Sequence, residues 1–123
     1  MIDRRKVSTI PTSYTGDNTG AEIMVDKSGR YVFGSNRGHD TLVTLLIDPE
    51  TGLLTPISWV TSQGKGPRFF AADPTRDWLY AANENSDTIV GFTIDRSTGK
   101  LVQSGPVVNT GSPVCIVFKE AAV

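Results

Sequence analysis

The chain has 123 residues, and its 12 lysine and arginine residues nearly balance its 13 aspartate and glutamate residues, for a net charge of -1. This length suits one domain, and a near-neutral chain without a basic block argues against a nucleic-acid surface or a polybasic membrane contact. The sequence shows neither a charged and then apolar leader nor a long apolar run. It therefore predicts no signal peptide and no membrane span, and it favours a cytoplasmic protein.

Short runs of β-branched and aromatic residues, separated by Asp, Asn, Gly, Pro and Ser, predict β-strands along the chain, because helical periodicity is almost absent. The first expected strand is Val7–Ile10, and the last is Val114–Phe118. Between them lie two groups of four: Glu22–Val25, Tyr31–Ser35, Thr41–Ile47 and Ile57–Thr61, then Phe69–Ala72, Trp78–Ala82, Thr88–Ile94 and Leu101–Val108.

The two groups of four strands are copies of one repeat. At an offset of about 47 residues, Asp26 aligns with Asp73, and Asn36 aligns with Asn83. Four strands at a period of about 45 residues are the spacing of a β-propeller blade. The expected fold class is therefore all-β, a β-propeller of four-stranded antiparallel blades, with two complete blades and parts of two others.

In this interpretation residues 1–123 form one partial propeller, with blades at 20–65 and 66–110. Residues 1–19 are the end of a preceding blade, and residues 111–123 carry the first strand of the closing blade. Two blades leave two apolar faces in water, whereas closed propellers usually need about 4–8 blades. The chain is therefore expected to be the tail of a longer protein, or to self-associate through its open blade faces.

The only cysteine, Cys115, excludes an intrachain disulfide. It lies in the apolar run of the last expected strand, Val114–Phe118. We expect it to be a small buried hydrophobic side chain there, not a catalytic thiol.

Five short motifs stand out: Gly20-Ala21-Glu22-Ile23, Gly29-Arg30-Tyr31-Val32, Ser35-Asn36-Arg37-Gly38-His39-Asp40-Thr41, Gly66-Pro67-Arg68-Phe69 and Ser112-Pro113-Val114-Cys115. Together they resemble the lactonase family of seven-bladed propellers, which includes propeller-type 6-phosphogluconolactonases and fungal carboxy-muconate cyclases. The resemblance covers the chain from about Lys6 to Phe118. It implies the C-terminal portion of such a propeller, so that residues of earlier blades would complete the site.

The repeat separates scaffold from candidate chemistry. Polar residues that recur at equivalent positions are expected to cap turns through hydrogen bonds. They are Asn36 and Asn83, Asp40 and Asp87, and Thr41 and Thr88.

Four charged or titratable residues do not recur: Glu22, Arg37, His39 and Arg68, whose counterparts are Phe69, Glu84, Ser86 and Ala21. In an up-and-down blade, the loop that enters the first strand lies at the same end as the loop between the second and third strands. The first strand also lines the central channel. All four residues are therefore expected at one end of the channel, with Glu22 and Arg68 nearest the axis.

These residue types suit the opening of a lactone ring. Glu22 or His39 would act as general base or acid, and Arg68 would stabilise the oxyanion. Arg37 and Arg68 would bind an anionic group of the substrate bidentately. The expected catalytic residues are thus Glu22, His39 and Arg68, and the substrate-binding residues are Arg37 and Arg68. The scheme requires no cofactor and no metal, since the lone histidine has no spaced ligand partner.

Structural roles are alternatives for each of these residues. Glu22 and Arg68 would form an ion pair between neighbouring blades, His39 would cap its loop, and Arg37 would pair with a nearby carboxylate. The sequence does not decide between the two sets of roles.

The first expectation for function is hydrolysis of an anionic sugar lactone, 6-phosphogluconolactone, to 6-phosphogluconate in the pentose phosphate pathway. The second is lactone formation of the carboxy-cis,cis-muconate cyclase kind, and the third is a non-catalytic binding module or an inactive fragment, because a fold alone does not fix a function. Whether this chain alone is an enzyme is left open.

Overall fold

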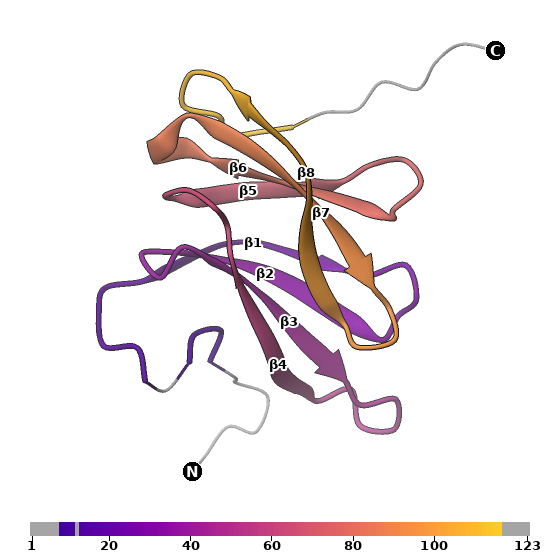
Figure 1. Ribbon diagram of the computed structural model, residues 1–123. Helices are drawn as coiled ribbons and strands as arrows, with labels where there is room; N and C mark the ends of the chain where they lie inside the picture. Colours follow the sequence, from indigo (N-terminus) through magenta and orange to yellow (C-terminus); the bar gives the residue numbers. More distant parts are fainter. Residues whose placement is uncertain (1–7, 12, 117–123) are drawn as a thin grey trace, which may run out of the picture.

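The computed structural model describes residues 8–11 and 13–116, apart from the side chain of Pro106. Its strands form two four-stranded antiparallel sheets that pack against each other (Figure 1). Blade 1 consists of β1 (Thr19–Val25), β2 (Tyr31–Arg37), β3 (Thr41–Ile47) and β4 (Leu54–Thr61). Blade 2 consists of β5 (Pro67–Ala72), β6 (Trp78–Asn83), β7 (Thr88–Asp95) and β8 (Lys100–Asn109), with a 3-10 turn, η1 (Glu84–Ser86), before β7.

In both blades the strands follow one another in chain order across the sheet, which is the up-and-down arrangement of a propeller blade. Each of the eight strands expected within the two repeats is present at the expected place. The predicted fold class, an all-β propeller of four-stranded antiparallel blades, is therefore confirmed.

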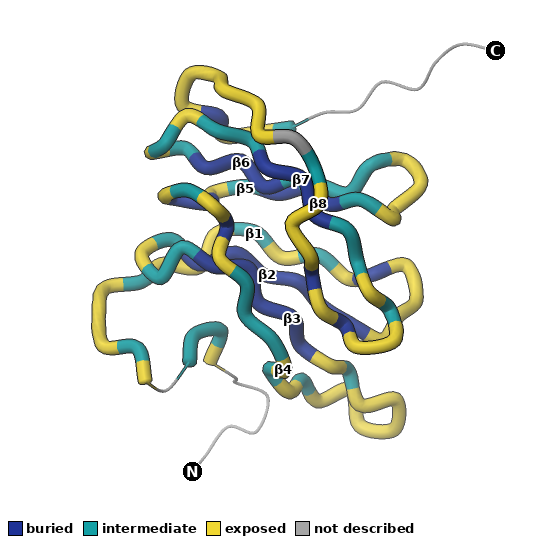
Figure 2. The backbone as a smooth tube through the Cα atoms, in the orientation of Figure 1, coloured by how far each residue is buried: buried dark blue, intermediate teal, exposed yellow. Residues whose placement is uncertain are grey.

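Alternation of side chains along each strand gives a blade two apolar faces. In β2, Tyr31 and Phe33 join the core between the blades, whereas Val32 belongs to a second cluster on the far face of blade 1. Blade 2 contributes Leu79, Val90 and Phe92 to the shared core. The side chains of this core are almost fully buried, and each such burial contributes about 1.5–3 kcal/mol. Figure 2 shows the resulting pattern, with buried central strands and more exposed edge strands.

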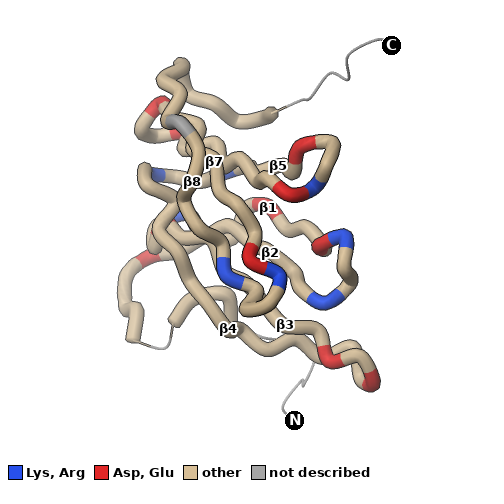
Figure 3. Tube along the Cα trace, turned by 45° about the vertical axis from the view of Figure 1, so that its right-hand side comes forward, with Lys and Arg blue, Asp and Glu red and all other residues tan. Residues whose placement is uncertain are grey.

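An arginine in the turn between β7 and β8 ties the blades together at one end. Arg96 donates to both carboxylate oxygens of Asp26, at 3.0 and 3.2 Å, and to Asp77 Oδ1 at 2.7 Å. Lys27 lies 2.9 Å from the same Asp77 oxygen, and Tyr31 donates to the backbone oxygen of Arg96. Figure 3 shows these charged turns of the two blades at the same end of the molecule.

The carboxylate of Asp26 is only 1% exposed. Burial raises the pKa of Asp26, but the hydrogen bonds from Arg96 and Ser28 outweigh burial, so the pKa lies below its ordinary value. The charged form is therefore the one that the folded chain stabilises.

The two outer strands expected from the sequence are not seen in the described residues. Ser8–Ile10 form a bend, and Val114–Ile116 pair with no strand, while Val7 and residues 117–118 lie outside the described part. A strand needs a neighbour for its backbone hydrogen bonds, and neither segment is paired with one in its described part. The assignment of these ends to further blades therefore stays a prediction.

The expectation of a buried Cys115 is wrong, because this cysteine is exposed. The apolar run that holds it forms no paired strand in its described part, so no sheet covers the thiol. Among the described residues, no helix has the length and apolarity that crossing a membrane requires.

Candidate functional site

Each blade has two kinds of loop, and they lie at opposite ends. The loops between β2 and β3 and between β6 and β7 lie at the same end as residues 62–66, which link the blades (Figure 1). The remaining hairpin turns lie at the other end. This division agrees with the expectation from up-and-down topology, and it places Arg37 and His39 at the linker end.

The recurring polar residues form the same scaffold in both blades. Asn36 donates to Thr41 Oγ1 at 3.3 Å, and Asn83 donates to Thr88 Oγ1 at 3.4 Å. Both asparagines are fully buried. The interpretation of these residues as scaffold is confirmed by their matching bonds.

Two recurring aspartates fasten each loop to the linker that follows its blade. Asp40 and Asp87 have φ values of 58° and 57°, a left-handed conformation that aspartate tolerates better than most residues. Asp40 Oδ1 accepts from the N–H of Gly66 at 3.0 Å, and Asp87 Oδ1 accepts from the N–H of Ser112 at 2.8 Å. The loops are therefore platforms, anchored to the following linker, for the residues between the asparagine and the aspartate.

The half-buried His39 is held on this platform by three contacts. Its Nδ1 lies 2.7 Å from Thr41 Oγ1, and its backbone N–H donates to Asn18 Oδ1 at 3.2 Å. The Tyr14 ring meets the imidazole edge to face, with 4.6 Å between the centroids. The ring is thus oriented by the segment before β1 as well as by its own loop.

Gly38 explains how the loop comes so close to that segment. Its φ is 113°, and a Cβ atom at this position would collide with the backbone carbonyl of Asp17. Only glycine fits such a close approach without strain. The Arg-Gly-His order of the motif therefore has a steric reason.

Arg37 ends β2, next to the histidine loop. Its Nε is buried and has no hydrogen-bond partner, and none of the ion pairs formed by the described residues involves this guanidinium. A carboxylate partner, which was the structural alternative for Arg37, is therefore not found among the described residues. A partly buried guanidinium without an acceptor suits an anionic ligand.

Arg68 behaves differently. It lies where the register of β5 and β6 shifts between Pro67 and Phe69, and its Nη1 is 3.6 Å from Glu84 Oε2. Glu84 is the counterpart of Arg37, and Ala21 is the counterpart of Arg68. Blade 2 thus pairs two charges at a place where blade 1 holds a single arginine.

Glu22 lies at an equivalent irregularity in β1, where the register shifts between Gly20 and Ile23 as at a β-bulge. Bulges commonly re-aim side chains next to active sites. The Glu22 N–H donates to Ser35 Oγ, and Glu22 Oε1 accepts from the N–H of Ile23 at 3.0 Å. The carboxylate makes no ion pair with Arg68, so the alternative of a Glu22–Arg68 blade clamp is not formed.

Glu22 and Arg76 line the two ends of one groove between the inner strands of the blades. The groove measures about 450 Å³, and its walls are the segments 22–25 of β1 and 69–72 of β5. Arg76 was not anticipated from the sequence. The repeat nevertheless contains a signal, because an arginine stands where blade 1 has the turn residue Gly29. In the structure Arg76 adopts the left-handed conformation of that glycine, with a φ of 62°.

The structure therefore gathers the predicted residues only in part. Arg37 and His39 lie on the same loop, and Asp40 of that loop binds Gly66, whose carbonyl accepts from the N–H groups of Arg68 and Glu84. Glu22 lies on the inner strand and lines the groove, which none of the other three predicted site residues lines. Tyr14 and Asn18, which hold His39, were also missed.

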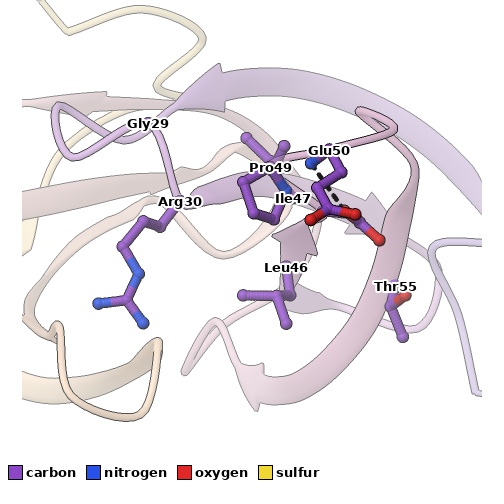
Figure 4. A pocket seen from close by; sticks show the side chains of 8 residues that line it. Gly29, Arg30, Leu46, Ile47, Pro49, Glu50 and Thr55 are labelled. Atoms are coloured by element: carbon purple, nitrogen blue, oxygen red, sulfur yellow. Dashed lines mark hydrogen bonds between the residues drawn. The ribbon is translucent and has the colours of Figure 1, made fainter.

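A larger hollow of about 580 Å³ lies at the other end of blade 1 (Figure 4). It is lined by Arg30, Leu46, Ile47, Pro49, Glu50, Thr55 and two neighbours, Gly29 and Asp48. None of the predicted site residues lines it. Within the described part of the chain, no group of three or more His, Cys, Asp or Glu side chains gathers in a way that would hold a metal ion.

Comparisons with known proteins agree on one family. The family model described as "Lactonase, 7-bladed beta-propeller" matches residues 1–118. Over 112 residues the chain is 37% identical to the 6-phosphogluconolactonase of Bacillus subtilis (strain 168), a match that covers 91% of this chain and 32% of that protein.

Solved structures give the same result. A protein from Lactobacillus plantarum has a TM-score of 0.86 and 34% identity, over 93% of this chain and 33% of that one. The periplasmic gluconolactonase of Pseudomonas aeruginosa has a TM-score of 0.78 and 31% identity, over 85% of this chain and 29% of that one. The chain thus spans a third or less of the length of these relatives.

Proposed function

The chain belongs to the lactonase family of seven-bladed β-propellers, and on this premise we propose that it supplies part of the active site of an enzyme that hydrolyses a sugar lactone. The proposed substrate is 6-phosphogluconolactone, and the product is 6-phosphogluconate. The proposal draws on the 37% identity to a 6-phosphogluconolactonase.

The observation that carries the proposal is the guanidinium of Arg37, which forms no ion pair with any of the described residues. Its Nε is buried without a partner, next to a histidine that the fold holds in place. At the equivalent place blade 2 has Glu84, which pairs with Arg68. An anionic group on the substrate would supply the acceptor that Arg37 lacks, and phosphate matches the guanidinium bidentately.

The reaction adds water to the lactone carbonyl carbon and breaks the ring C–O bond. A carboxylate such as Glu22 would take the proton of the attacking water and return it to the leaving alkoxide. Glu22 Oε1 accepts from the N–H of Ile23, whereas no hydrogen bond from the described residues reaches Oε2. His39 and an arginine would bind the carbonyl oxygen as its negative charge develops.

The second candidate is cyclisation of a carboxylated muconate, since a substrate carboxylate would also satisfy Arg37. The third candidate is a propeller module that binds a ligand without turnover. The compartment depends on the substrate, because a phosphorylated sugar favours the cytoplasm, whereas one structural neighbour is a periplasmic gluconolactonase.

The test measures three reactions of the purified chain, each with the spontaneous rate subtracted. Two are the hydrolysis of 6-phosphogluconolactone and of unphosphorylated gluconolactone, and the third is the cyclisation of carboxy-muconate. We expect Arg37→Met to lower kcat/KM for the phosphorylated lactone by about 100-fold or more, the cost of a charge-assisted contact, and to change the unphosphorylated lactone little. Arg30→Met, at the other end of the blade, is the matched control. No acceleration on any lactone, or equal losses in the two arginine variants, would contradict the proposal.

We further propose that the chain self-associates through its open blade faces. Ile23 and Val25 of β1 are 65% and 56% exposed, and Val102 and Val108 of β8, which point away from the shared core, are both 49% exposed. Apolar side chains that gather on a sheet surface favour association. Light scattering should therefore give a mass above that of one chain, and a monodisperse monomer at micromolar concentration would contradict this.

A further inference from the structure

We infer that Thr41 is a positioning residue that fixes the ring proton of neutral His39 on Nε2. In this state the imidazole acts as a hydrogen-bond donor to the lactone oxygen, and the role of general base falls to Glu22. The chemical meaning of the inference rests on the proposed function, whereas the tautomer itself is a property of the folded chain.

The argument begins with the orientation of the buried Asn36 amide. Its Nδ2 lies 2.6 Å from the backbone oxygen of Thr9, an atom that can only accept. Its Oδ1 lies 2.7 Å from Thr9 Oγ1, a hydroxyl that can donate, and 3.3 Å from Asn18 Nδ2, which can only donate. These partners exclude the flipped amide, so the NH₂ group also faces Thr41.

The second step concerns the single proton of the Thr41 hydroxyl. Asn36 Nδ2 donates to Thr41 Oγ1 at 3.3 Å, so this contact does not use the hydroxyl proton. Among the described residues, the other hydrogen-bond partner of Oγ1 is His39 Nδ1, at 2.7 Å. If Nδ1 carried the ring proton, the buried hydroxyl would have no acceptor among the described residues, and a buried donor without an acceptor is unfavourable. The hydroxyl therefore donates to Nδ1.

In the neutral ring the proton is then on Nε2. No hydrogen bond from the described residues reaches this nitrogen, so it remains available to a ligand. An Nε2–H group can stabilise an oxyanion without transferring its proton. The proton of the attacking water then passes to Glu22 and from Glu22 to the alkoxide, so that no proton is gained or lost by the histidine.

Blade 2 shows that the Asn–Thr pair is a reused part of the scaffold. Asn83 donates to Thr88 Oγ1, and Thr88 Oγ1 lies 3.3 Å from Ser86 Oγ. Ser86 stands at the histidine position and accepts from the N–H of Lys65. The threonine of this pair thus contacts a serine hydroxyl in blade 2 and a histidine ring in blade 1.

The test is nitrogen NMR of the full chain labelled with ¹⁵N-histidine, at an alkaline pH where the ring is neutral. His39 is the only histidine, so its two ring nitrogens give an unambiguous pair of signals. We expect the Nε2–H tautomer to exceed the other by about tenfold or more, as one buried hydrogen bond predicts. Thr41→Val should return the ratio toward that of free histidine, and Thr41→Ser should restore it.

Thr88→Val is the matched control, and it should leave the His39 signals unchanged. An Nδ1–H tautomer in the unmodified chain would overturn the inference, as would an unchanged ratio in Thr41→Val. If Thr41→Val does not fold, Thr41→Ala removes the same hydroxyl and replaces it in the comparison with Thr41→Ser. An Nε2–H ring in a chain that hydrolyses no lactone would leave the inference intact and refute the proposed function.

Discussion

Blades 1 and 2 build the same loop from the same asparagine, threonine and aspartate, yet they place different residues on it. In blade 1 the loop carries Arg37, which has no carboxylate partner among the described residues, and His39, whose ring is held by Thr41. In blade 2 the equivalent residues are Glu84, which pairs with Arg68, and Ser86. The comparison shows that one scaffold has two uses: it carries a structural cross-link in blade 2 and a candidate site in blade 1.

Substitutions of the scaffold asparagines are expected to lower the free energy of unfolding the most. Asn36 uses both ends of its amide, whereas Asn83 Oδ1 is buried without a partner. We expect Asn36→Ala to lower the free energy of unfolding by about 3 kcal/mol and Asn83→Ala by about 2 kcal/mol. Denaturant unfolding of the two variants measures the difference, and a larger loss for Asn83→Ala would show that the two loops are not held in the way described.

The next largest loss of stability is expected at the end of the blades that carries the hairpin turns. Arg96 has Pro49 as its counterpart, and it binds the nearly buried Asp26 across the blade interface. Arg96→Met should therefore cost about 2–3 kcal/mol, because it leaves a buried carboxylate unpaired. Lys100→Met, at an exposed position of β8, should change the free energy of unfolding by less than about 0.5 kcal/mol. Equal losses would argue against the cross-blade contact.

The same contact predicts a loss of stability in acid. Because the folded chain holds the pKa of Asp26 below its ordinary value, stability from this group is present above about pH 4 and is lost as the pH falls through the lower folded pKa. Unfolding measured between about pH 2 and pH 6, a range that includes the ordinary pKa of aspartate, should show this loss. Asp26→Asn should flatten the profile, and an unchanged acid slope in that variant would assign the loss to other carboxylates.

A small effect on stability is expected at the histidine position, where the two loops differ. His39→Ser gives blade 1 the residue of blade 2, and it should change the free energy of unfolding by less than about 1 kcal/mol, since the ring is only half buried. A fluorescence-monitored melt of this variant beside the unmodified chain measures the change. A loss as large as that of Asn36→Ala would make His39 a structural residue.

The fold was predictable because its signals are local and repeated. Turn residues such as Asp26 and Gly52 recur one repeat later, and the continuous apolar run Tyr31-Val32-Phe33 favours a strand that is covered on both faces. Contacts across the blades were not predictable from such patterns. Arg96 differs from Pro49 in the alignment of the repeats, but nothing in the sequence shows which carboxylate it reaches.

The sequence predicted at which end of the molecule the candidate site lies, but not how its side chains are arranged. Topology placed Arg37 and His39 together, because loops of one kind share an end of a blade. The sequence could not show that Arg68 pairs with Glu84, that Arg76 shares the groove of Glu22, or that Thr41 contacts the histidine ring. These facts depend on bulges and side-chain directions that repeat spacing does not encode.

The most direct test of the account compares kcat/KM for lactone hydrolysis in two variants at equivalent positions. His39→Ser removes the ring from the loop of blade 1, and Ser86→Ala changes the matching residue of blade 2. We predict a loss of about 100-fold for His39→Ser, the typical cost of removing one oxyanion donor, and a change within about twofold for Ser86→Ala. Wild-type kcat/KM in His39→Ser, or equal losses in both variants, would contradict the assignment of the chemistry to blade 1.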